Sequence, residues 1–449
     1  MPRRRRKWIG CLASYSGRSN NMRYLVLLFL CFSAIIAYIQ RTGVNSVKQP
    51  ICGDLGINTE DFGIIGSAWL VGYALMQVPA GWLADRYGGR NVLAALAVVW
   101  SILTGVIGWC TTFEAFLVVW FLMGMALAGI FPCAAKLIGA WFPDTEKAMA
   151  SGLLGSATML GNALAGWLTV RMVDDLKFSW QTTYVAYGAI GVFWAGAYLL
   201  SIRERVGPQA VSTPMARADW TRMAGSISLW LLCGQQFFRA GAMIFFINWF
   251  PVFLREERGF TQKGAGDGAF WVGLAAMTGG ICGGFFSDWL FRRTGWRRLC
   301  RQGIALVGMT AAGGLVLASR LISDNSVALA IFMVGAFIAS FGGVSGWTVA
   351  IEFGGRRIGV VFSMMNMAGN FGGAIVNFVA GSLTERTGSW DAALLVVAGV
   401  FFVDSICWVL LNPKQPLFVD PALPVDDTGI RVGEPPARRG DFEEHHEPR

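Results

Sequence analysis

The stretch GWLADRYGGR, residues 81–90, decides the fold. It joins two long apolar runs, residues 61–83 and 91–110, and a helix needs about 20 mostly apolar residues to cross a bilayer. The junction is a glycine turn that carries one carboxylate, Asp85, and two guanidinium groups. We therefore expect a tight loop at a membrane surface, with its arginines on the cytoplasmic side.

The same arrangement recurs in the second half of the chain. GFFSD at residues 284–288, which ends in Asp288, is followed by RRTG at residues 292–295. Two halves built on one plan, each with a charged turn after its second apolar run, are typical of secondary transporters.

Composition indicates that most of the chain lies in lipid. Hydrophobic residues make up 54% of it and charged residues 14%, with a mean hydropathy of +0.51. A soluble domain carries about 25% charged residues. The formal net charge is +9, but the basic residues gather on alternate loops, at residues 3–7, 203–222 and 292–301. This pattern places both ends of the chain in the cytoplasm and argues against nucleic acid as a partner.

The chain is predicted to be an all-α membrane protein with twelve spans, six before a polar linker and six after it. An even number agrees with both ends lying on one side of an inner membrane. We expect a basic N-terminal tail (1–22), a first bundle (23–203), a cytoplasmic linker (204–226), a second bundle (227–411) and a disordered tail (412–449). Met22 is an alternative to Met1 as the true start. The spans are residues 23–43, 61–83, 91–110, 113–137, 148–170, 182–202, 227–254, 269–290, 303–319, 326–350, 359–383 and 392–411.

Neither a metal nor a cofactor is expected. The nine cysteines show no metal-ligand spacing, and the only histidines, His445 and His446, lie in the polar tail. No nucleophile–base set or phosphate loop is evident, so we do not expect an enzyme.

Polar side chains inside spans are costly in lipid, so they usually mark a pathway. Arg239 lies deep in the seventh span, with Gln236 a turn before it, and Arg41 lies late in the first span behind Tyr38. Arg41 has an alternative interpretation, since a long side chain near a helix end can snorkel to the interface. Asn248 comes nine residues after Arg239, so both reach one cavity only if the helix breaks near Gly241 or Pro251.

Two further groups each lie on one helix face. Tyr73 and Gln77 are four residues apart in the second span, and Asn366 and Asn370 have the same spacing in the eleventh. Amides that only hold helices together are the alternative for the second pair.

One cationic group from each half implies an anionic substrate, because a guanidinium meets a carboxylate or phosphate with two parallel hydrogen bonds. Arg41 and Arg239 are the two groups, and Asp404 and Glu352 are candidate proton sites. The expected partners are a small anionic solute, a coupling ion such as a proton or sodium, and the lipid bilayer.

The turn at residues 81–90 resembles the loop signature of the major facilitator superfamily. Residues 23–411 are most similar to its anion:cation symporter family, which includes sugar-acid transporters and sialin. The similarity is carried by residues 67–86, by the sequences FP at 131–132, WFP at 141–143, NWFP at 248–251 and RG at 258–259, by Trp347 with Glu352, and by NMAGN at 366–370.

The resemblance implies two pseudo-symmetric six-helix bundles, and it implies roles for single residues. Arg41, Tyr73, Gln77 and Asn370 occupy positions that line the substrate site in that family. The charged turn implies a gate that stabilises one conformation. To this gate we assign Gly81, Asp85, Arg86, Gly88, Arg90 and the Asp288 of the second half.

Three positions depart from the family pattern. Bacterial members carry an aspartate where this chain has Gln40, and an arginine and a glutamate where it has Trp120 and Leu127. The two carboxylates are the usual proton carriers of the family, so the coupling ion is left open.

The sequence thus predicts a monomeric inner-membrane carrier that moves a small organic anion, a sugar acid or another carboxylate, by alternating access. An organophosphate/phosphate exchanger and an uncoupled anion facilitator are alternatives on the same fold. A non-transporting sensor built on a carrier scaffold is a remote alternative.

Overall fold

The computed structural model of the protein describes residues 3–202, 215–411 and 416–418, and these residues form helices joined by short turns. Spanning helices of the first half are α1 (Arg3–Thr42), α3 (Thr59–Tyr87), α4 (Gly89–Ile107), α5 (Phe113–Leu127) continued by α6 (Ile130–Trp141), α7 (Lys147–Val170) and α8 (Trp180–Ser201). Those of the second half are α10 (Ile227–Asn248) continued by α11 (Phe250–Glu256), α12 (Gln262–Thr294), α13 (Ile304–Ser319), α14 (Asn325–Gly354), α15 (Ile358–Thr387) and α16 (Trp390–Leu410).

Shorter elements connect them. They are η1 (Gly43–Val47), α2 (Lys48–Leu55), η2 (Arg171–Asp175), α9 (Arg217–Ala224), η3 (Leu299–Gly303) and η4 (Gly355–Arg357). Eleven continuous segments of the described chain are long and apolar enough to cross a membrane, and the longest, Asn325–Thr387, holds both α14 and α15. The predicted twelve-helix membrane fold is therefore confirmed.

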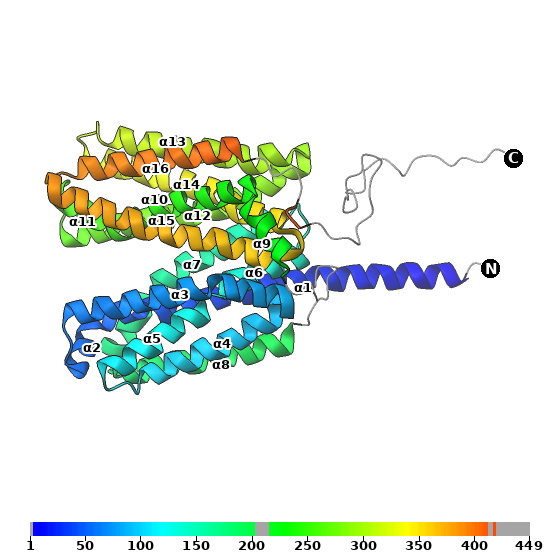
Figure 1. Cartoon of the computed structure of the whole chain (residues 1–449), viewed down its shortest axis with the longest axis horizontal. Helices are drawn as coiled ribbons and strands as arrows, with labels where there is room; N and C mark the ends of the chain where they lie inside the picture. Colours follow the sequence, from blue (N-terminus) through cyan, green and yellow to red (C-terminus); the bar gives the residue numbers. More distant parts are fainter. Residues whose placement is uncertain (1–2, 203–214, 412–415, 419–449) are drawn as a thin grey trace.

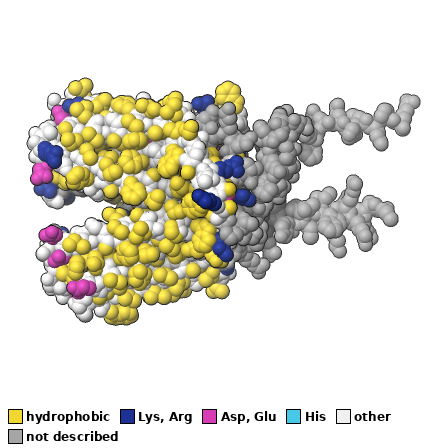
Figure 2. Space-filling model, in the orientation of Figure 1, with side chains coloured by type: hydrophobic (Ala, Val, Ile, Leu, Met, Phe, Trp, Pro, Cys, Tyr) yellow, Lys and Arg dark blue, Asp and Glu magenta, His cyan; other side chains and the backbone are white. Residues whose placement is uncertain are grey.

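The helices form two groups that lie side by side, α1–α8 in one and α10–α16 in the other (Figure 1). The first and last described residues lie at the same end of the molecule, and α9 lies there too (Figure 1). We call this end the terminal face. The opposite end is the open face, where a notch separates the halves (Figure 2). Hydrophobic side chains cover the flanks between the two faces, as a lipid environment requires (Figure 2).

The structure revises several expected boundaries. α1 begins at Arg3, so the described part of the expected N-terminal tail is helical rather than a separate segment. The fourth span is interrupted between α5 and α6, and the seventh between α10 and α11. Most of the expected linker and tail, residues 203–214, 412–415 and 419–449, lie outside the described residues. Leu417 and Phe418 fall inside the tail expected to be disordered, yet both are buried.

Glycines set the closest helix contacts, and the same contact occurs in both halves. In the second half, a side chain on Gly279 or Gly283 of α12 would overlap a backbone carbonyl oxygen of α14. In the first half, Gly72 of α3 meets the backbone of α5 in the same way. Small residues allow helix backbones to approach closely where lipid offers no hydrophobic driving force.

We predict that Gly283→Ala destabilises the protein by about 1–3 kcal/mol, because the new methyl group overlaps the carbonyl oxygen of Phe341 and forces the two helices apart. The matched control is Gly273→Ala on the same helix, where nothing lies within 4 Å of the added carbon. Thermal unfolding in detergent measures both variants. Equal melting temperatures for the two variants would contradict this account of the helix contact.

Candidate functional site

Asp85 fastens the two halves together at the terminal face. It is 1% exposed, and its Oδ1 and Oδ2 accept hydrogen bonds from the backbone N–H groups of Gly359 (2.9 Å) and Val360 (3.0 Å). These are the second and third residues of α15, whose first-turn N–H groups have no partner within the helix. Lys136 of α6 completes the contact, with its Nζ 3.0 Å from Asp85 Oδ1 and donating to the carbonyl oxygen of Arg356 (2.9 Å). We call this the first clasp.

The second clasp repeats this geometry with the halves exchanged. Asp288 of α12 accepts from the backbone N–H groups of Ala148 (3.3 Å) and Met149 (2.7 Å), the second and third residues of α7. Arg301 pairs with Asp288 (2.9 Å) and with Glu352 (3.1 Å). In each clasp a carboxylate from one half caps a helix of the other half, where the partial positive charge of the helix favours an anion.

Both clasps lie at the terminal face, and the helix backbones touch beside them. A side chain on Gly81 would overlap the backbone of Gly359, and one on Gly284 would overlap that of Ala148. The halves are therefore closed at the terminal face, while the notch at the open face separates them (Figure 2).

The assigned gate residues divide into two groups. Gly81, Asp85 and Asp288 lie at the contact between the halves. Arg86 is exposed over the rings of Trp82 and Tyr87, and Arg90 donates to the carbonyl oxygens of Leu199 (2.6 Å) and Ile202 at the end of α8. Gly88, at φ +87°, ends α3. The last three thus make their contacts within the first half.

Sequence reasoning missed the basic partners of the clasps, Lys136 and Arg301. Lys136 carried a signal, because it is a lone charge near the end of the fourth apolar run. Arg301 was hidden among the other arginines of its loop.

Arg41 lies on α1 against aromatic rings. Its guanidinium carbon is 4.0 Å from the ring centroid of Trp69 and 5.6 Å from that of Tyr38, and Trp69 stacks on Tyr73 at 4.9 Å. Within the described part of the chain, Arg41 forms no ion pair and donates no hydrogen bond. It lines a small cavity of about 10 Å³. The other lining residues are Ala37, Tyr38, Trp69, Tyr73, Leu127, Ile130 and Phe131.

A chain of polar groups crosses between the halves beside this cavity. Asn366 of α15 donates from Nδ2 to the Tyr73 hydroxyl (3.3 Å) and to Gln77 Oε1 (3.2 Å) on α3. Asn370 donates from Nδ2 to the carbonyl oxygen of Asn366, which lies one helical turn earlier (2.9 Å). The Nε2 of Gln77 is buried and has no hydrogen-bond partner among the described residues. The structure thus brings Tyr73, Gln77, Asn366 and Asn370 together.

The second-half arginine lies on the other side of α15. Arg239 donates to Gln236 Oε1 (2.7 Å), and Gln236 packs against Gly369, between the two asparagines of the polar chain. Arg239 also faces Gly343 of α14. The two arginines therefore approach α15 through different helices. Arg239 reaches it through Gln236, and Arg41 is linked to it only through Trp69 and Tyr73 of α3.

Asn248 is not part of this cluster. It is exposed at the last residue of α10 and donates to Asn377 Oδ1 (2.9 Å). Asn377 lies seven residues beyond Asn370, which is about 10 Å along a helix, toward the open face. The helix does break directly after Asn248, but the break leaves this amide near the open face, bonded to Asn377 of the same half.

The two candidate proton sites have unlike surroundings. Asp404 on α16 is fully buried, and the cation whose charge acts on it is Arg239. Glu352 pairs with Arg301 and so belongs to the second clasp.

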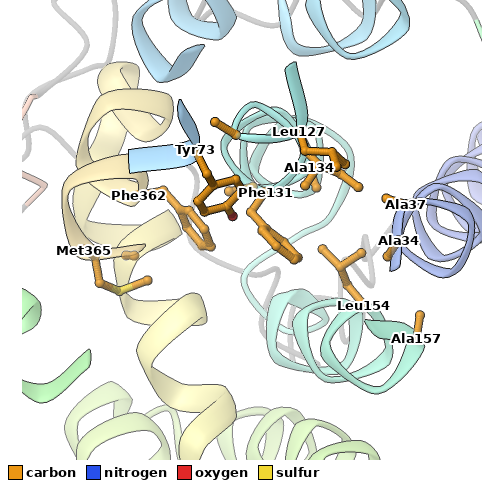
Figure 3. Close-up of a cluster of buried hydrophobic side chains, with 14 of the residues drawn as sticks. Ala34, Ala37, Tyr73, Leu127, Phe131, Ala134, Leu154, Ala157, Phe362 and Met365 are labelled. Carbon is orange, nitrogen blue, oxygen red and sulfur yellow. The ribbon is translucent and has the colours of Figure 1, made fainter. Parts of the chain in front are cut away.

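An aromatic floor separates the polar chain from the clasps. Phe131 lies at its centre, with ring centroids 5.3 Å from Trp347 of α14 and 6.4 Å from Tyr38, and Trp347 contacts Phe362 at 5.7 Å. Figure 3 shows Phe131 and Phe362 converging with Tyr73 from three different helices. From the terminal face, α15 presents the first clasp, then Phe362, then the asparagines.

A sequence model of the Major Facilitator Superfamily matches residues 30–377. The chain belongs to this superfamily. It is therefore a multi-pass membrane transporter and not an enzyme, as the sequence analysis expected. The fold is that of the E. coli fucose:proton symporter FucP, at a TM-score of 0.70 and 18% identity, with 87% of this chain and 99% of that one covered.

Curated relatives are similar over most of their length. The chain is 26% identical to the probable sulfoacetate transporter of Cupriavidus necator, over 92% of this chain and 97% of that protein. It is 26% identical to the probable galactarate/D-glucarate transporter of Escherichia coli (87% and 94% covered) and to the hexuronate transporter of Bacillus subtilis (88% and 96%).

We predict that Asp85→Asn opens the terminal face. The neutral amide accepts weaker hydrogen bonds from α15 and leaves Lys136 without its counter-charge, a loss of about 1.5–3 kcal/mol. The probe is the alkylation rate of Ser363→Cys in a cysteine-free background, because Ser363 is buried beside Gly81 between the halves. We expect the rate to rise about tenfold or more.

The matched control is Asp391→Asn, which removes an exposed ion pair with Arg320 elsewhere in the second half. An Asp85→Asn rate that equals the control rate would contradict the clasp.

Proposed function

We propose that this transporter moves a small organic anion, a sugar acid or another carboxylate or sulfonate, by alternating access. The observation that carries the proposal is Arg41, a guanidinium that lines a cavity and has no anionic partner within the described residues. Arg41 is half-buried, and a guanidinium that leaves water without an opposite charge loses hydration that nothing replaces. A bound carboxylate or sulfonate supplies that charge.

The groups around Arg41 suit an oxyanion. The buried Nε1 of Trp69 and Nε2 of Gln77 are hydrogen-bond donors that have no partner among the described residues. The Trp69 indole lies beside the guanidinium, and Gln77 lies two turns further along α3, next to Asn366. Spare donors near a guanidinium favour a ligand rich in acceptor oxygens. Tyr38, Tyr73, Gln236, Asn366 and Asn370 are proposed to bind its remaining polar groups, and Arg239 to provide the second positive charge. Asn248 is proposed to act at the mouth rather than at the bound anion.

The names of the relatives agree with this chemistry, since sulfoacetate, galactarate, glucarate and hexuronate are all organic acid anions. Basic residues gather near the terminal face in Figure 2, and we propose that this face is cytoplasmic in an inner membrane. We further propose a monomer with two bundles, residues 23–203 and 227–411.

Asp404 favours proton coupling over an uncoupled facilitator. Asp404 is a fully buried carboxylate whose charge acts on Arg239, and uptake of a proton would remove that charge. Glu352 is a poorer candidate, because its partner Arg301 holds it in the second clasp. Sodium coupling and an organophosphate/phosphate exchanger are the competing mechanisms, and a sensor without transport is the remote one.

The test is uptake into proteoliposomes of labelled sugar acids, short carboxylates, sulfonates and phosphate esters. We predict that Arg41→Gln lowers kcat/KM for the accepted anion at least about thirtyfold, the equivalent of about 2 kcal/mol for a lost buried charge pair. Arg41→Lys should retain part of the activity. Arg171→Gln, which alters an exposed pair with Asp175, is the matched control.

The same assay separates the mechanisms. Stimulation by an imposed proton gradient that Asp404→Asn abolishes supports proton coupling, whereas a requirement for phosphate inside the vesicles supports the exchanger. Full uptake of organic anions by Arg41→Gln, or no uptake of any anion by the unaltered protein, would overturn the proposal.

A further inference from the structure

The loop between α14 and α15 binds a segment of the C-terminal tail. The backbone N–H of Leu417 donates to the carbonyl oxygen of Phe353 (2.7 Å), and the N–H of Arg356 donates to the carbonyl oxygen of Phe418 (3.1 Å). Phe418 is 1% exposed and Leu417 8%. Two backbone hydrogen bonds and two buried apolar side chains make this a specific contact.

Gly355 makes the contact sterically possible. It lies between the two bonded residues at φ +56°, in the left-handed region that glycine tolerates best. A Cβ at this position would overlap the carbonyl oxygen of Phe418. The loop and the tail therefore fit each other only because this residue has no side chain.

The bound loop is also part of the first clasp. The backbone N–H of Arg356 donates a hydrogen bond to the tail. Its carbonyl oxygen accepts one from the Nζ of Lys136 in the other half. The next residue, Arg357, pairs with Asp219 of α9 in the connection between the halves (3.1 Å). One short loop thus joins the tail, the connecting segment and the opposite half.

We propose that Pro416–Leu417–Phe418 is a strap that stabilises the closed terminal face. By bonding to Phe353 and Arg356, the strap fixes the loop backbone and so holds the Arg356 carbonyl oxygen toward Lys136. An acceptor fixed in advance binds its donor more tightly, because less conformational freedom is lost when the bond forms.

The strap acts only on the closed state, since Lys136 leaves Arg356 when the halves separate at this face. A group that binds one of two states more tightly shifts the population toward that state. The coupling is reciprocal, so closure of the terminal face also favours docking of the strap. The strap rests on alternating access but not on any choice of substrate.

The test measures the distance between spin labels at Tyr87 and Arg293 in nanodiscs without substrate. Both residues are exposed and lie at the C-terminal ends of α3 and α12, which reach the terminal face. We expect Gly355→Ala, which expels the strap but leaves its sequence intact, to raise the ratio of long to short distances about tenfold. The double variant Leu417→Asp/Phe418→Asp should give the same shift. One control is Gly388→Ala, also at positive φ (+63°), which lies just beyond the other end of α15 and has nothing within 4 Å of the added carbon.

A chain that ends at Leu411 gives a second measurement. A synthetic peptide of residues 412–449, added to this truncated chain, should restore the short distance, and only a protein that remains folded can respond in this way. The strap is overturned if the strap variants keep the distances of the unaltered protein, if Gly388→Ala shifts them equally, or if the peptide has no effect. Because no substrate is added, these results test the strap even if the transported molecule is not an organic anion.

Discussion

A carboxylate bound to the first turn of a helix in the opposite half is the interaction on which this structure depends. It occurs twice: Asp85 of α3 binds the start of α15, and Asp288 of α12 binds the start of α7. In each case the carboxylate oxygens accept hydrogen bonds from the N–H groups of the second and third residues of the helix. Neither helix has a side-chain cap of its own. The first-turn N–H groups of these two helices therefore have a partner within the protein only while the terminal face is closed.

The strength of these clasps suits a reversible gate. A hydrogen bond to a charged group contributes about 1.5–3 kcal/mol, but burying the charges costs a comparable amount. Separation of the halves returns both the carboxylates and the helix ends to water, which bonds to them in turn. A few kcal/mol from an anion bound at Arg41 is therefore enough to shift the equilibrium between the closed and the open terminal face.

The fold followed from the sequence because its signals are local. Hydropathy over single runs gives the spanning helices, and the repeated charged turn gives the relation between the halves. Asp85 and Asp288 were found for the same reason. The breaks after Leu127 and Asn248 were harder to locate, because the flanking residues are apolar on both sides and the hydropathy does not change.

The partners of individual side chains could not be predicted from the sequence, because they come from segments far apart in the chain. Arg86 and Arg90 lie in the same turn as Asp85, yet they contact the first half, and nothing in their spacing distinguishes them from Lys136, which does reach the other half. Helix periodicity places Asn248 opposite Arg239 unless the helix breaks, and periodicity carries no information on depth in the membrane. Leu417 and Phe418 belong to a three-residue apolar run, LFV at 417–419, in a mostly polar tail, which is too short a signal to predict a docked segment.

The most direct test of the account places an anion beside Arg41 from within the protein. Leu127 lines the same cavity, so Leu127→Glu offers the guanidinium an internal carboxylate, and Leu127→Gln is the neutral control of the same shape. Binding of the transported anion is measured by calorimetry from pH 5 to pH 8. We predict that Leu127→Glu binds the anion at least about tenfold more weakly than Leu127→Gln at pH 8, where the glutamate is charged, and that the difference narrows toward pH 5 as a larger share of the glutamate is protonated. Affinity that matches the Leu127→Gln control at every pH would contradict the claim that Arg41 receives the substrate's charge.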